Sequence, residues 1–80
     1  MAKQRVKLTF PPELITQPVI YNMGRQFDVV TNIRRANVTR EQGWVILELS
    51  GEQPEIERAI AWAIDQGVRV DPIEGDIVAG

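Results

Sequence analysis

The sequence predicts an α+β fold in which two helices cover one face of a four-stranded antiparallel sheet. Four segments alternate between apolar and polar residues with the period of a half-buried strand. Two others repeat apolar residues at intervals of three and four, as amphipathic helices do. Their order along the chain is strand, helix, strand, strand, helix, strand. Because every element has one apolar face, we expect a two-layer βαββαβ sandwich of the ferredoxin-like type, with the second and fourth strands at the sheet edges.

The first strand and the first helix are expected within residues 5–26. Val6, Leu8 and Phe10 share one strand face, and Pro11-Pro12 ends the strand because proline cannot donate to a sheet ladder. The first helix is predicted to begin at Pro18 and to run to about Gln26. Its apolar stripe comprises Ile20, Met23, Gly24 and Phe27. The glycine costs about 1 kcal/mol of helix propensity, and we expect a close approach of helix to sheet to offset this cost.

Residues 28–39 and 44–50 are predicted to form the second and third strands. The turn between them lies around Arg-Glu-Gln-Gly, where Gly43 is expected to supply the permissive backbone. In the third strand, one face carries Val45, Leu47 and Leu49 and the other carries Trp44, Ile46 and Glu48. The second face would lie away from the helices.

The second helix is expected to begin at Pro54 and to end at Gly67 in the left-handed conformation. Its apolar stripe comprises Ile56, Ala59, Ile60, Ala63 and Ile64. Trp62 lies roughly 120° from that stripe, so it either folds over the helix rim, which we favour, or faces a partner. A last strand is predicted over residues 68–74, and Pro72 is typical of an edge strand.

The composition narrows the function classes. Eighty residues make a single domain, residues 1–80, with no room for a second core. The chain has no cysteine and no histidine, so we expect neither an enzyme nor a metal or cofactor site. A net charge of -2, spread along the chain, argues against nucleic acid as a partner. No signal peptide or membrane span is recognisable, which indicates a cytoplasmic protein without membrane insertion.

Acidic residues near the C-terminus resemble loose cation ligands. Asp71, Glu74 and Asp76 lack the spacing of a calcium-binding loop, however. Solvated charges are the favoured interpretation.

The alternation of the second strand changes phase within VTNIRRANV, residues 30–38. Val29 and Ile33 share one parity, whereas Ala36 and Val38 share the other. A β-bulge near Arg34-Arg35 would explain the change, since bulges favour sheet edges and binding sites. A regular edge strand whose charges discourage aggregation is an equally weighted alternative.

The same stretch carries a family resemblance. FDVVTNIRRANV followed by GWVILELSG resembles the NIL domain, which is named for an Asn-Ile-Leu motif. Asn32 and Ile33 match that motif, and Arg34 replaces the leucine. The segments LTFPPELITQPVI and AIAWAIDQGVRVDPI resemble the remaining helices and strands of the family, so the resemblance covers nearly the whole chain.

The resemblance implies a ferredoxin-like fold related to amino-acid-binding ACT domains. It also implies a regulatory role, because NIL domains lie at the C-terminus of methionine-importer ATPases, where paired domains bind L-methionine near their interface and inhibit transport. The asparagine of the motif lies in that site and corresponds to Asn32. In other proteins a similar domain precedes an iron–sulfur ferredoxin module, but this sequence has no cysteine to hold such a cluster.

A free amino acid needs polar anchors for its charged ends and an apolar slot for its side chain. Asn32 supplies an amide, Ile33 and Ala36 are candidates for the slot, and Arg34 for a two-pronged contact with a carboxylate. Asn32 has a competing interpretation, in which its side chain caps its own backbone. For Arg34 the favoured interpretation is a solvated charge. Trp44 and Ile46 are candidates for an interface with a partner or second copy, or Trp44 simply covers its neighbours.

Two functions follow from these residues. The leading hypothesis is a small regulatory module that senses an amino-acid-like effector such as methionine at the edge of a homodimer. The alternative is a ligand-free interaction module that docks on a transport or iron–sulfur redox partner through Trp44, Ile46 and the edge strand.

Overall fold

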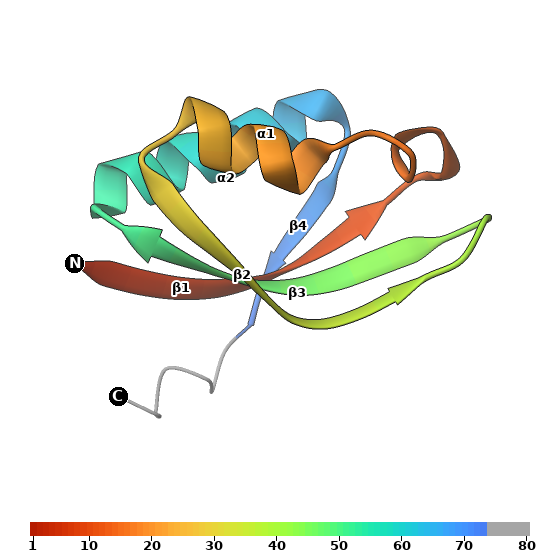
Figure 1. Ribbon diagram of the computed structural model, residues 1–80, viewed down its shortest axis with the longest axis horizontal. Coiled ribbons are helices and arrows are strands. Elements are labelled where there is room, and N and C mark those ends of the chain that lie inside the picture. Colours follow the sequence, from red (N-terminus) through yellow and green to blue (C-terminus); the bar gives the residue numbers. More distant parts are fainter. Residues whose placement is uncertain (74–80) are drawn as a thin grey trace.

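The computed structural model describes residues 1–73, which fold into the two layers that the sequence predicts (Figure 1). The sheet contains β1 (Ala2–Phe10), β2 (Val29–Val38), β3 (Gly43–Gly51) and β4 (Arg69–Pro72). The helices are α1 (Val19–Gln26) and α2 (Gln53–Gln66), and a short 3₁₀ helix, η1 (Pro12–Leu14), follows β1. The strand order is β2-β3-β1-β4, and all neighbours are antiparallel. The ferredoxin-like prediction is therefore confirmed, including the edge positions of β2 and β4.

The hydrophobic core lies between the sheet and both helices, which cover the same face (Figure 1). The central strands supply Val6 and Leu8 from β1 and Val45, Leu47 and Leu49 from β3. The helices add Val19, Met23, Ile56, Ala59 and Ala63. Each large aliphatic side chain buried in this way stabilises the fold by about 1.5–3 kcal/mol. The opposite face of the sheet carries no helix within residues 1–73, and we call it the open face.

Helix α1 begins at Val19, one residue later than predicted, with Pro18 in the capping position. Met23 of the predicted stripe is buried, but Gly24 is exposed. A Cβ atom at Gly24 would lie 3.9 Å from its nearest neighbour, an atom of Thr31. The helix therefore does not approach the sheet closely there, and the reason proposed for this glycine is wrong.

Helix α2 ends as the sequence predicts. Gly67 has a φ of 107°, and its N–H donates to the carbonyls of Ala63 and Ile64. The Val68 N–H donates to the Ala63 oxygen at 3.1 Å, which completes the glycine-based helix stop. Ile64 is 54% exposed, so its assignment to the buried stripe is wrong. It lies roughly 80° around the helix from Ile56 and falls on the rim.

Trp62 also lies on the rim of α2 and packs against Phe27. Its ring lies 6.1 Å from the Phe27 ring, centroid to centroid, at an interplanar angle of 58°. Trp62 thus packs over the end of α1, as the favoured interpretation has it.

The β2–β3 turn is built by Thr39 and not by Gly43. The Thr39 N–H donates to the Gln42 oxygen at 2.8 Å, and its hydroxyl accepts the Gln42 N–H at 3.1 Å. Gly43 is the first residue of β3 and has no positive φ. A Cβ there would meet Val38 at 3.4 Å, so the position is narrow, and the prediction of a turn glycine is wrong.

A contact between layers fixes the point at which the chain enters β2. The Asp28 N–H donates to Oε2 of Glu55 at 2.8 Å, and the other Glu55 oxygen contacts Arg58. Beside it, a Cβ at Gly51 would lie 2.8 Å from the Asp28 carbonyl oxygen. Glycine is therefore required there by the close approach of two backbones.

Candidate functional site at the edge strand β2

Strand β2 forms a long exposed margin of the sheet. It pairs with β3 on one side, and no other strand within residues 1–73 pairs with its outer side. Residues 32–38 are all exposed. An edge of this kind presents unpaired main-chain N–H and C=O groups, which a ligand or another strand can bind.

A β-bulge interrupts the strand at the predicted place. Ile33 lies opposite Leu47 and Arg35 opposite Ile46, so Arg34 has no partner across the ladder. The extra residue changes the phase of the strand. The side of β2 toward the helices therefore carries Val29, Thr31, Ile33, Ala36 and Val38, and the open face carries Val30, Asn32, Arg35 and Asn37.

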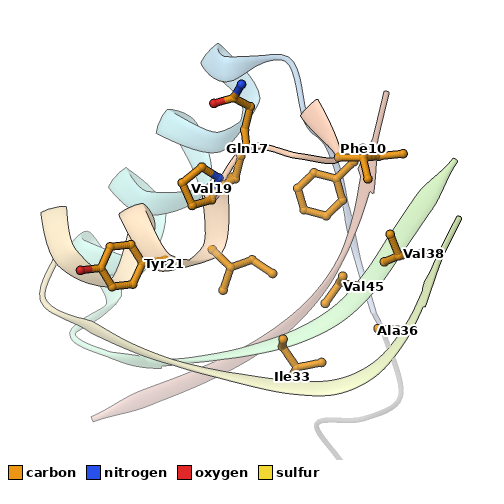
Figure 2. A pocket seen from close by; sticks show the side chains of 11 residues that line it. Phe10, Gln17, Val19, Tyr21, Ile33, Ala36, Val38 and Val45 are labelled. Carbon is orange, nitrogen blue, oxygen red and sulfur yellow. The ribbon is translucent and has the colours of Figure 1, made fainter. Parts of the chain in front are cut away.

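An apolar pocket of about 280 Å³ lies on the helix side of this edge (Figure 2). Ile33, Ala36 and Val38 line it from β2, and Val45 lines it from β3. The remaining lining comes from the end of β1, the segment leading into α1 and the first turn of α1: Phe10, Ile15, Gln17, Pro18, Val19, Ile20 and Tyr21. Ile33 and Ala36, the two candidates for an apolar slot, thus share one pocket.

The pocket is almost entirely apolar in chemistry. Gln17 and Tyr21 are the lining residues with polar side chains. In Figure 2 the Gln17 amide and the Tyr21 hydroxyl lie on the outer side, away from Ile33, Ala36 and Val38. Ile33 and Val38 are 55% and 54% exposed, so the mouth of the pocket is apolar as well. An aliphatic or thioether group fits such a pocket, whereas a charged group would have to stay outside it.

Asn32 and Arg34 do not line this pocket. Asn32 lies opposite Glu48 and belongs to the open face, while Arg34 is the bulged residue. The four candidate residues therefore adjoin one edge but do not converge in one cavity of a single subunit. Sequence reasoning missed Ile15 and Gln17, which lie in the connection between β1 and α1, and Tyr21, which lies in the first turn of α1 outside the predicted apolar stripe.

Trp44 and Ile46 lie on the open face, as expected, and both are half-buried. The Lys7 ammonium stands 5.2 Å from the centroid of the Trp44 ring, in the geometry of a cation–π contact. Next to them Arg5 Nε donates to Glu48 Oε2 at 3.2 Å. Their use as an interface remains a prediction.

The acidic residues do not form a cation site within residues 1–73, where no cluster of three carboxylate, thiol or imidazole side chains could hold a metal. Asp71 instead accepts a hydrogen bond from Arg69 at 3.0 Å. Glu74 and Asp76 lie outside the described residues. Neither described helix has the length and apolar character needed to cross a bilayer.

Comparisons with known proteins agree with this fold. The chain is 34% identical over 74 residues to the methionine import ATP-binding protein MetN of Halalkalibacterium halodurans, a match that covers 88% of this chain and 22% of that protein. The chain thus spans about a fifth of the length of this relative. The C-terminal domain of an ABC transporter ATP-binding protein from Enterococcus faecalis shares the fold, with a TM-score of 0.78 at 24% identity over 90% of this chain and 84% of that one. Residues 4–72 match the NIL domain, and the chain belongs to the NIL domain family.

Proposed function

We propose that this chain is a regulatory domain that senses an amino-acid-like effector, such as methionine, at the β2 edge of a homodimer. The observation that carries the proposal is the apolar pocket, lined by Ile33 and Ala36, beside the outer side of β2, with which no strand of residues 1–73 pairs. The relation to an ATP-binding protein of methionine import supports both the regulatory role and the class of effector.

The pocket and the strand edge are expected to bind different parts of the effector. The apolar chain of the effector enters the pocket past Ile33 and Ala36. Its ammonium and carboxylate groups stay at the edge, because burying an unpaired charge is costly. The main chain of β2 and the Arg34 guanidinium are exposed there. The Asn32 amide faces the open side, so its contact is expected over the outer margin of β2.

The homodimer follows from the same edge. Antiparallel pairing of two β2 strands would satisfy the free ladder groups of both subunits and place two sites side by side. A measurement of mass in solution, with and without methionine, tests this part of the proposal.

A thermal-stability screen against free amino acids tests effector binding. A ligand at about 100 times its Kd adds about 2.7 kcal/mol to the free energy of unfolding. Methionine or a close relative should produce that gain, and Asn32→Ala should remove it. Asn37→Ala, which changes an asparagine on the same strand and the same face, should leave it intact. If no amino acid changes the stability of the chain, the proposal fails.

The half-buried Trp44 and Ile46 on the open face favour a second candidate, a ligand-free interaction module for a transport or redox partner. One variant distinguishes the two candidate functions. Trp44→Ala would abolish a partner complex in the second case, and the same chain would be indifferent to methionine.

A further inference from the structure

Among residues 1–73, the side chains of the open face carry a different net charge from the remaining side chains. The sequence as a whole has a net charge of -2. The register of the strands nevertheless places mostly basic side chains on the open face: Lys3, Arg5, Lys7, Arg35 and Arg69, against Glu48 and Asp71. The other acidic side chains of residues 1–73 lie elsewhere, on the helices, the loops and the turns: Glu13, Asp28, Glu41, Glu52, Glu55, Glu57 and Asp65. The described part of the molecule is therefore electrostatically polarised.

Two ion pairs engage both acidic side chains that residues 1–73 place on this face. Arg5 pairs with Glu48 at 3.2 Å, where the side chains are 25% and 16% exposed. Arg69 pairs with Asp71 at 3.0 Å. Within residues 1–73, Lys3, Lys7 and Arg35 have no such carboxylate partner. The positive excess that the described residues give the open face therefore comes from these three side chains.

The excess charge surrounds an apolar centre. Ile46 lies between Arg35 on β2 and Lys7 on β1 in the same row of the sheet. Trp44 occupies the next row of β3, with the Lys7 ammonium 5.2 Å from its ring centroid. An aromatic residue flanked by basic side chains has the composition of an interface hot spot. Complementary charge around such a centre fixes the orientation of a partner and speeds its arrival.

We propose that the open face docks an acidic polypeptide segment that carries an apolar side chain. The apolar side chain packs on Trp44 and Ile46, and flanking carboxylates of the partner pair with Lys7 and Arg35. This inference goes beyond the sensing role, because the pocket lined by Ile33 and Ala36 opens on the other side of β2. The docking proposal therefore does not depend on the effector pocket.

Nucleic acid fits this face less well. Single-stranded RNA is read by several aromatic side chains on which bases stack. Among residues 1–73 the open face offers Trp44 alone. Glu48 and Asp71 would in addition repel phosphates. An acidic peptide has no closely spaced phosphates for these carboxylates to repel. Its own carboxylates need only the basic side chains on either side of Ile46, Lys7 and Arg35.

Heteronuclear NMR titration of the whole chain tests the proposal with defined probes. The probes are a Glu-Glu-Phe-Glu-Glu peptide, the same peptide with Lys in place of Glu, and an oligouridylate of equal charge. The acidic peptide should shift the amide signals of β1 and β3 and the Trp44 indole signal. Its affinity should fall severalfold between about 50 mM and about 200 mM sodium chloride, since exposed charges are screened.

Paired variants locate the site. Lys7→Gln with Arg35→Gln should weaken binding of the acidic peptide about tenfold. Arg25→Gln with Arg40→Gln removes the same charge from α1 and the turn and should leave the affinity unchanged. The proposal is overturned if the acidic peptide leaves the open face unshifted, if both double variants respond alike, or if the oligouridylate binds more tightly. Methionine sensing is scored separately by thermal stability, so either idea can fail alone.

Discussion

Asn32 lies directly across the ladder from Glu48, on the face of the sheet that carries no helix among the described residues. Its neighbour in the motif, Ile33, lies on the helix side and lines the pocket. Two consecutive residues therefore serve opposite faces of one edge strand. A ligand that depends on both must lie at the margin of the sheet.

Asn32→Ala should change effector binding without changing the fold. The side chain is exposed, and it makes no hydrogen bond within residues 1–73. Its loss should therefore alter the free energy of unfolding by no more than about 0.5 kcal/mol. Urea denaturation measures this directly. A large loss of stability would instead show that Asn32 has a structural role at the edge.

Ala36→Leu should reduce effector binding by filling the pocket. Ala36 is exposed and lines the cavity, so a larger apolar side chain can occupy that space without disturbing the core. We expect the stabilisation by methionine to fall while the stability of the free chain stays close to that of the original. Asn37→Leu, on the opposite face, is the control. Equal responses of the two variants would show that the pocket is not used.

Gly24→Ala should stabilise the protein by about 0.5–1 kcal/mol, because the position is helical and exposed and the added methyl group meets nothing closer than 3.9 Å. Gly67→Ala should have the opposite sign. Its φ of 107° costs a residue with a Cβ about 1–2 kcal/mol. Thermal unfolding of both variants checks the pair, and a loss of stability in Gly24→Ala would mean that this helix position is more crowded than its surroundings suggest.

Gly51→Ala should destabilise the fold by about 1–3 kcal/mol, since the new methyl group would stand 2.8 Å from the Asp28 carbonyl oxygen and force two backbones apart. Chemical denaturation gives the magnitude. Amide exchange should show the opening at the start of β2. A neutral result would indicate that the Asp28 backbone moves freely.

Glu55→Ala should cost about 1–2 kcal/mol, because it removes the carboxylate that accepts the Asp28 N–H at 2.8 Å. Glu57→Ala is the matched control two residues further along the helix, where the carboxylate accepts an exposed hydrogen bond from Gln53. It should be neutral within about 0.5 kcal/mol. Equal losses in the two variants would trace the effect to helix charge and not to the inter-layer hydrogen bond.

Local patterns predicted most of the fold but little of the pocket. The strands β1 and β3 follow from the alternation of apolar and polar residues, and the end of α2 follows from Gly67. These features depend on residues close together in the sequence, so the sequence predicts them. The face of Asn32 was also available, since it follows from its alternation with Ile33. Ile15 and Gln17 line the pocket only because the chain folds back from β1 into α1. No hydrophobic periodicity in the sequence indicates that change of direction. Gly24 and Gly43 were misjudged because a sequence shows that a glycine is present but neither its backbone conformation nor the space around it.

The bulge at Arg34 has a consequence for comparing relatives. Since this residue has no counterpart on β3, removing it would leave every other side chain of β2 facing the same way. The third letter of the Asn-Ile-Leu motif thus falls at a position where the ladder tolerates a change of residue type, or even of length. An arginine at this position thus places a positive charge at the margin of the sheet without any change in the strand pairing beneath it.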